Sequence, residues 1–308
     1  MNVAYVSHAD CGRHDTGWKH PEHVGRLRAI SRALRNDPDL FANLVHHEGR
    51  HASQEELAIS HEPEYVERVR EMAEGGGGQL DPDTVISEGS WDAATAAAGC
   101  LLDAVDMAFD GRATRAYCAV RPPGHHALRA RGMGFCLFGN VALAARYARV
   151  RSLADRILIV DWDVHHGNGT QALVQAERDI RFISLHQWPW YPGTGRADER
   201  GPFANVWNIP MAAGLRAGEY AEALVRAIDA ATTDFRPDLV LVSCGFDSLR
   251  GDPLGGFTFE LADMEMLTRE LVTRAEGWCG GRMIVALEGG YDPDRVGEGS
   301  VAIMRSLL

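Results

Sequence analysis

Two runs of the sequence are apolar at every position, and they constrain the fold more than any other feature. Residues 157–160 are Ile-Leu-Ile-Val and residues 239–242 are Leu-Val-Leu-Val. Successive residues of a strand point to opposite faces of a sheet, so a strand of this kind must be covered on both faces. Parallel sheets flanked by helices provide that cover. The two runs therefore predict a parallel sheet in an α/β protein.

Other short β-branched runs alternate with longer helical patterns along the whole chain. The expected strands are residues 3–7, 115–120, 156–163, 181–186, 206–209, 239–243 and 283–287. The expected helices are residues 24–36, 62–74, 90–109, 140–149, 218–234, 260–276 and 293–306. This alternation predicts one α/β domain over residues 1–308 with a mainly parallel sheet. We expect the four glycines at 75–78 to form a flexible surface loop.

Charge and composition exclude several classes of protein. The chain has 43 Asp and Glu against 31 Lys and Arg, a net charge of -12, which argues against nucleic-acid binding. Lys19 is the one lysine, and no G-x-x-x-x-G-K sequence exists, so a phosphate-loop NTPase is excluded.

Cysteine usage and hydropathy bear on the compartment. The six cysteines form no C-x-x-C pair and are too sparse for a disulfide scaffold, so we expect reduced, buried thiols. We see neither a signal peptide nor a stretch long enough to span a membrane. The sequence therefore predicts a cytoplasmic protein with no membrane contact, and it leaves assembly into a homo-oligomer open.

Acidic and imidazole side chains follow the first apolar strand. Residues 161–169 are Asp-Trp-Asp-Val-His-His-Gly-Asn-Gly. Asp161, Asp163 and His165 share one side of an extended segment, where they are costly to bury unless they are paired or bind a metal. Carboxylate oxygens with imidazole suit zinc and other divalent ions. The alternative is a hydrogen-bonded polar turn that caps the next helix.

Three further segments at strand ends carry chemically useful side chains. His125 and His126 follow a rigid Pro-Pro-Gly turn, and they are either a catalytic pair or loop residues without a catalytic role. Asp247 follows the second apolar strand and is either a third metal ligand or a helix cap. Tyr291 follows two glycines, which either let the backbone approach a ligand or form an ordinary turn. The pair His46-His47 has no such neighbours, and we interpret it as surface or core.

Together these segments supply the parts of a metal-assisted hydrolase at one edge of a parallel sheet. Asp163, His165 and Asp247 make a three-ligand site with a position open for water, as catalytic zinc requires. The histidine pair offers a general base and acid, and the Tyr291 hydroxyl offers a donor to a developing oxyanion.

Six ordered segments resemble the zinc-dependent histone deacetylase family, and most closely its class II branch and bacterial relatives. They are residues 121–127, 134–140, 161–171, 184–195, 245–256 and 288–291. The resemblance runs from His20-Pro21-Glu22 to the last expected helix. It implies the arginase/deacetylase fold, a three-layer α/β/α arrangement with a parallel sheet of roughly eight strands. It also implies removal of acetyl or related acyl groups from lysine side chains in a peptide or protein.

The resemblance also assigns roles to individual residues. Zinc would be held by Asp163, His165 and Asp247, and His125 and His126 would be the catalytic histidines. Asp161 would lie behind His125, and Asn168 behind His126, where many relatives outside class II carry Asp. A structural potassium ion would be bound by Asp161 and Ser184 and by the carbonyls of Asp163, His165 and Leu185.

The same resemblance describes the substrate tunnel. Phe135 and Tyr191 would line it, and Tyr191 stands where Phe is more usual. The Gly134 carbonyl would accept the substrate amide N–H. Leu254 would lie at the tunnel mouth, where polyamine-selective relatives carry a glutamate that pairs with the ammonium group of the substrate. Leu254 therefore favours acyl-lysine, although Asp83 or Glu88 on an earlier loop offers another carboxylate.

Three alternatives keep the fold but change the activity. An arginase-like ureohydrolase with two manganese ions needs further bridging carboxylates, and His166 and Ser248 stand where these would be needed. An acetylpolyamine amidohydrolase shares the site chemistry and differs in its substrate. An inactive acyl-lysine reader would have lost the tyrosine, and Tyr291 is present.

Overall fold

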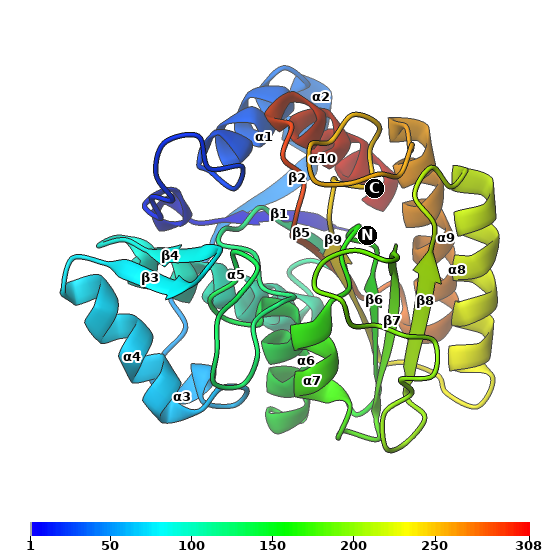
Figure 1. Cartoon of the computed structure of the whole chain (residues 1–308). Helices are drawn as coiled ribbons and strands as arrows, with labels where there is room; N and C mark the ends of the chain where they lie inside the picture. The colour runs from blue at the N-terminus through cyan, green and yellow to red at the C-terminus, as the bar shows by residue number, and fades with distance from the viewer. Residues whose placement is uncertain (1) are drawn as a thin grey trace.

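The structure, a computed structural model, describes residues 2–308 and is built on an eight-stranded sheet in which all neighbouring strands are parallel (Figure 1). The strand order is β2-β1-β5-β10-β9-β6-β7-β8. The strands are β1 (Val3–Ser7), β2 (Leu44–Glu48), β5 (Arg115–Cys118), β6 (Ile157–Asp161), β7 (Ile180–Gln187), β8 (Val206–Met211), β9 (Leu239–Cys244) and β10 (Met283–Leu287). The predicted parallel sheet is confirmed.

Two layers of helices cover the sheet, one on each face (Figure 1). One layer contains α3 (Gln54–Leu57), α4 (Pro63–Glu74), α5 (Ser90–Asp110), α6 (Asn140–Val150) and α7 (Asn168–Val174). The other contains α1 (Gly25–Arg35), α2 (Pro38–Asn43), α8 (Ala217–Thr232), α9 (Leu261–Cys279) and α10 (Pro293–Leu307). A short 3-10 helix, η1 (Ala9–Gly12), follows β1.

The central strands divide their side chains between two hydrophobic cores. In β6, Ile157 and Ile159 belong to the core beneath α5 and α6, whereas Leu158 and Val160 belong to the core beneath α8 and α9. All four side chains are 0% exposed. The two-sided burial inferred from the unbroken apolar runs is therefore the observed arrangement.

The sequence analysis did not predict strands β2, β3 and β4. Strand β2 lies at the edge of the sheet, where only Leu44 is buried and the four residues after it are half-buried or exposed, so its sequence has no long apolar run. Its His46 is exposed, in agreement with the surface interpretation. The glycines at 75–78 lead into an antiparallel hairpin of β3 (Gly78–Asp81) and β4 (Thr84–Ile86), so Gly78 belongs to a strand and not to the predicted loop.

Two compositional expectations can be checked. All six cysteines are free and buried, as predicted. Within residues 2–308, every helix is too short or too polar to cross a lipid bilayer.

A buried ion-pair network ties the segment before α1 to the loop after β5. The Arg121 guanidinium donates to both carboxylate oxygens of Glu22, at 2.5 and 2.7 Å, and Arg26 donates to one of them at 3.2 Å. Burial opposes the charge on Glu22, but the two arginines outweigh it and lower the pKa of the carboxyl to about 2. This network fixes the position of the chain just before the His125-His126 pair.

The buried histidines His14 and His61 predict a loss of stability in mild acid. Burial lowers the pKa of each imidazole to about 4. His61 accepts a hydrogen bond from the Gly139 N–H at 2.9 Å and contacts the Leu128 carbonyl at 3.0 Å, so its neutral form is fully bonded. Between pH 6.5 and about 4 the unfolded chain binds protons that the folded chain does not, so stability falls as pH falls. Each histidine contributes up to about 3 kcal/mol.

Urea unfolding at several pH values between 7 and 4 measures this effect. His61→Gln keeps a donor and an acceptor but does not titrate, so the free energy of unfolding should decline less steeply with acid in this variant. An unchanged slope would show that His61 does not titrate as described. His46→Gln, at an exposed position, serves as the control.

Candidate active site

Asp163, His165 and Asp247 meet at the carboxyl-terminal edge of the sheet, in the loops after β6 and β9. The His165 Nδ1 atom lies 3.0 Å from Asp163 Oδ1 and 3.2 Å from Asp247 Oδ2. The two carboxylates are 0% exposed and the imidazole is 7% exposed. One potential ligand atom from each residue lies within 4.8 Å of the others. The structure thus brings together the three residues predicted as a metal site.

The electrostatics of these three side chains fit a bound cation. One ring nitrogen carries at most one proton, so it cannot satisfy two carboxylates at once. Asp247 Oδ2 is buried without a hydrogen-bond partner among the described residues. Burial and the neighbouring Asp163 raise the pKa of Asp247 to about 7, and the two carboxylates outweigh burial and raise the pKa of His165 to about 10. Two carboxylates and one imidazole are a suitable donor set for zinc.

Two glycines allow the backbone to pass close to the carboxylates. A Cβ atom on Gly245 would lie 2.2 Å from Asp163 Oδ2, and one on Gly289 would lie 2.2 Å from Asp247 Oδ2. The Gly289 N–H donates to Asp163 Oδ2 at 2.8 Å. The Gly-Gly pair before Tyr291 therefore lets the backbone pass close to the carboxylates of Asp163 and Asp247.

The His125-His126 pair is buried beside this cluster, which argues against two histidines that merely occupy a surface loop. His125 Nδ1 lies 3.0 Å from Asp161 Oδ2, and His126 Nδ1 lies 2.7 Å from Asn168 Oδ1. Carboxylate and amide oxygens accept hydrogen bonds, so both Nδ1 atoms carry the proton and both Nε2 atoms remain available. The predicted partners of both histidines are confirmed.

The two histidines differ in their affinity for a proton. Burial disfavours the charged form of both. At His125 the carboxylates of Asp163 and Asp161 outweigh burial and raise its pKa well above the usual value. At His126 burial acts together with the nearby His125 and His165 to lower its pKa well below that value. Neutral His126 can therefore accept a proton, while His125 stays hydrogen-bonded to a carboxylate.

The structure also bears on the alternatives for the segments that contain Asp247 and residues 161–169. No helix follows Asp247 directly within the described residues, so it is not a helix cap. Asn168 is the first residue of α7, so the segment at 161–169 both forms the site and leads into a helix. His166 is bonded at both ring nitrogens, to Thr194 at 2.8 Å and to Gln171 at 2.9 Å.

Glu288 is a residue of the site to which the sequence assigned no role. Its Oε2 atom accepts the N–H groups of Gly124 at 2.6 Å and His125 at 3.1 Å, and Ser243 donates to its Oε1 at 3.1 Å. The side chain is 1% exposed. Glu288 thus holds the loop that carries the histidine pair. Its place directly after an apolar strand, beside two glycines, was the available signal.

A cavity of about 230 Å³ reaches His126 of the histidine pair and His165 of the predicted metal site. Its wall is formed by Asp83, His126, Gly134, Phe135, His165, Trp190, Tyr191, Leu254 and Tyr291. All four predicted tunnel residues are among them. The sequence analysis offered Asp83 or Glu88 as a further carboxylate for a substrate cation. Asp83 lies in the cavity wall, whereas Glu88 is exposed outside the cavity.

Trp190 was missed by the sequence analysis. Its indole N–H donates to the Leu254 carbonyl at 2.9 Å, which joins two loops at the cavity. Asp83 is held by the Gly134 N–H at 2.9 Å. The aromatic segment Trp-Pro-Trp-Tyr at 188–191 was the signal for Trp190, but nothing in it indicated which ring would face the cavity.

Tyr291 is positioned by its backbone and by its ring. Its N–H donates to Asp252 Oδ2 at 2.7 Å, and its ring contacts the Phe135 ring edge-on, with centroids 5.8 Å apart. Burial and the carboxylates of Asp247 and Asp163 raise the pKa of the phenol well above its usual value. The hydroxyl is therefore a neutral hydrogen-bond donor at the cavity.

Of the residues predicted to bind potassium, Asp161 lies on β6 and Ser184 and Leu185 lie on the neighbouring strand β7, while Asp163 and His165 lie in the loop after β6. Asp161 and Ser184 are direct partners in the β6–β7 ladder. Asp161 Oδ1 accepts the Asp163 N–H at 3.1 Å, Ser184 Oγ lies 3.0 Å from His186 Nδ1, and the Leu185 carbonyl accepts the Tyr220 hydroxyl at 3.2 Å. Their role as ion ligands stays a prediction.

Comparison with known proteins agrees with this fold and this site. The model of the histone deacetylase domain matches residues 20–307. A histone deacetylase-like amidohydrolase of Pseudomonas aeruginosa is 37% identical over 292 residues, which cover 93% of this chain and 76% of that protein. A Synechocystis protein described as uncharacterized is 41% identical over 310 residues and 99% of both chains. The crystal structure of the HDA15 HD domain superposes with a TM-score of 0.94 at 35% identity, over 100% of this chain and 88% of that one.

The three-layer architecture is that of the arginase/deacetylase fold, with the buried site at the carboxyl ends of its parallel strands. Within this fold class, the chain belongs to the histone deacetylase family, and it is a hydrolase of the deacetylase type.

Proposed function

We propose that this protein is a zinc-dependent amidohydrolase that removes acetyl or related acyl groups from lysine side chains. The observation that carries the proposal is the contact of one buried imidazole nitrogen, His165 Nδ1, with two buried carboxylates, Asp163 and Asp247, at the base of a narrow cavity. Zinc held by these three residues would polarise the amide carbonyl and lower the pKa of a bound water. The proposed domain is the whole chain, and a potassium ion on Asp161 and Ser184 is part of the proposal.

In this proposal the protein's own groups handle the proton. His126 Nε2 accepts a proton from the attacking water, because its Nδ1 already donates to Asn168. The water oxygen bonds to the acyl carbon, and the C–N bond then breaks as His126 passes its proton to the leaving nitrogen. The products are a lysine side chain with a free amine and acetate or a related carboxylate. His125 stays bonded to Asp161 and keeps its neighbour oriented.

Other wall residues bind and shield the substrate. The rings of Phe135 and Tyr191 and the side chain of Leu254 exclude bulk water from the reacting amide, which strengthens the polar contacts inside. The Tyr291 hydroxyl donates to the oxyanion of the tetrahedral intermediate. The Gly134 carbonyl accepts the substrate amide N–H.

Specific residues bear on two alternative activities, an arginase-like reaction and the hydrolysis of acetylpolyamines. A second metal ion, as in an arginase-like site, would need ligands near His166, and both nitrogens of that ring are already bonded. An acetylpolyamine amidohydrolase would need a carboxylate for the cation of its substrate. Leu254 supplies none, whereas Asp83 lies in the cavity wall and its bond to the Gly134 N–H leaves other oxygen lone pairs free, so the comparison of substrates described below decides between the two activities.

The zinc proposal predicts one divalent ion per chain and inhibition by hydroxamates. Asp247→Ala should lose both metal and turnover, because it removes a ligand and leaves Asp163 beside an incomplete site. Metal content by mass spectrometry and hydrolysis of an acetyl-lysine peptide measure the two effects. Asp198→Ala, at an exposed carboxylate paired with Arg196, should change neither. A fully active Asp247→Ala enzyme, or two metal ions per chain, would refute the proposal.

The oxyanion role of Tyr291 predicts a loss in kcat. Tyr291→Phe should lower kcat about 10²–10³-fold with a smaller change in substrate binding, as for a lost oxyanion donor. Tyr147→Phe removes a hydroxyl that is bonded to Asp106, and it should leave kcat unchanged. If Tyr291 only packs against Phe135, the two variants will behave alike.

The substrate proposal predicts a higher kcat/KM for an acetyl-lysine peptide than for N8-acetylspermidine. Leu254→Glu should shift the ratio toward the polyamine, because a carboxylate at the mouth would pair with its ammonium group. Glu88→Gln, outside the cavity, is the control. A preference of about tenfold or more for the polyamine in the unmodified enzyme, about 1.4 kcal/mol in transition-state binding, would contradict the assignment to acyl-lysine.

A further inference from the structure

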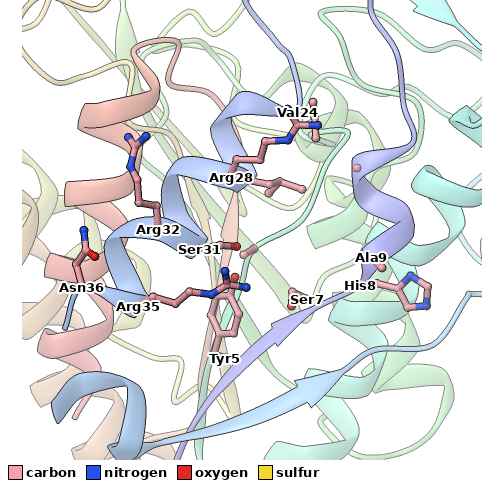
Figure 2. A pocket seen from close by; sticks show the side chains of 13 residues that line it. Tyr5, Ser7, His8, Ala9, Val24, Arg28, Ser31, Arg32, Arg35 and Asn36 are labelled. Atoms are coloured by element: carbon pink, nitrogen blue, oxygen red, sulfur yellow. The ribbon is translucent and has the colours of Figure 1, made fainter. Parts of the chain in front are cut away.

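A second cavity, larger than the proposed substrate cavity, lies between α1 and the end of β1 (Figure 2). Its volume is about 630 Å³, within the range of small-molecule sites. Tyr5 and Ser7 of β1 and Ser31 of α1 lie close together and form its floor, and Gly12 and Ala119 also line it.

The wall of this cavity is basic, although the protein as a whole is acidic. The net charge is -12, yet the thirteen residues around the cavity contain three arginines and a histidine but no Asp or Glu. Arg28, Arg32 and Arg35 follow one another at intervals of four and three residues, so they share one side of α1.

Two of these arginines have no partner for their guanidinium group. Arg32 is paired with Asp294 and points toward α10. Arg28 and Arg35 have no hydrogen bond, ion pair or aromatic contact through their guanidinium groups within residues 2–308, and both extend on the cavity side of the helix (Figure 2). Every other arginine has at least one such partner, even those at exposed positions such as Arg216 and Arg226. The charges of Arg28 and Arg35 are therefore uncompensated by direct contacts, whereas Arg32 is paired with Asp294 and His8 lies beside Asp10.

The spacing of the two free guanidinium groups indicates the shape of a ligand. Residues seven apart lie two helical turns apart, about 10 Å along the axis. Guanidinium groups bind phosphate and carboxylate in a forked geometry, and the hydroxyls of Ser7, Ser31 and Tyr5 supply further donors between them.

We propose that this cavity binds a soluble small molecule that carries two anionic groups, at least one of them a phosphate. One anionic group binds Arg28 and the other binds Arg35, and the body of the molecule lies against the hydroxyls of the floor. This site is separate from the substrate cavity, with which it shares no wall residue.

Calorimetric titration of the protein tests the proposal. Fructose 1,6-bisphosphate serves as the probe with two anionic groups, and fructose 6-phosphate is the matched probe with one. The bisphosphate should bind at least tenfold more tightly. Arg28→Gln and Arg35→Gln should each remove that advantage, because each leaves one guanidinium group. Arg32→Gln, on the same helix but paired with Asp294, should change the affinity less than twofold.

Several results would overturn the proposal. These are no binding of the bisphosphate by the unmodified protein, equal affinity for the two sugars, or binding that persists in both single variants. Sedimentation with phosphatidylcholine vesicles that contain phosphatidic acid forms a second arm. Vesicle binding that Arg28→Gln and Arg35→Gln both abolish, without binding of the free bisphosphate, would assign the cavity to a lipid headgroup and not to a soluble ligand. Thermal melts of all three variants confirm that each is folded.

Discussion

Buried negative charge at the end of the sheet is the constraint on which the rest of the structure depends. Asp161, Asp163, Asp247 and Glu288 are each at most 1% exposed. Isolated carboxylates are very costly to bury, so each one needs hydrogen bonds or an opposite charge. Backbone N–H groups supply part of this: Val164 donates to Asp247 at 2.9 Å, and Gly289 donates to Asp163 at 2.8 Å. Asp247 Oδ2 is left without a hydrogen-bond donor, and this is the observation that favours a metal ion beside Asp163, His165 and Asp247.

Two buried arginines hold the loop between Glu288 and Tyr291 and the loop that carries the histidine pair. Arg26 of α1 donates to the carbonyls of Gly290, at 2.6 Å, and Glu288, so it fixes the backbone that precedes Tyr291. Arg121 is held by Glu22 and precedes the histidine pair. The N-terminal segment and α1 thus hold the loops that carry Tyr291, the proposed oxyanion donor, and His126, the proposed general base. A small displacement of either loop would be costly for catalysis, because the reacting groups must meet within hydrogen-bond distance.

Helix α1 has different partners on its two sides. Residues two apart on a helix point about 200° away from each other. Arg26 therefore points into the protein and supports the catalytic loops, whereas Arg28 points away from them toward the second cavity. The same geometry explains why Arg26 is fully buried and bonded while Arg28 and Arg35 are exposed and lack partners. The helix separates the second cavity from the loops of the active site.

The sequence by itself determined the parallel sheet, because an unbroken apolar strand such as 157–160 is stable only when both of its faces are covered. It also determined that Asp163, His165 and Asp247 would meet, since the carboxyl ends of parallel strands share one edge. The edge strand β2 escaped detection because most of its residues are half-buried or exposed, so it has no continuous apolar run. Only the tertiary structure decided that Asp83 and Trp190 join the cavity wall, and that Arg28 and Arg35 have no partner. Both outcomes depend on which residues from distant parts of the chain lie near one another after the loops and layers have packed. They therefore correspond to no local pattern in the sequence.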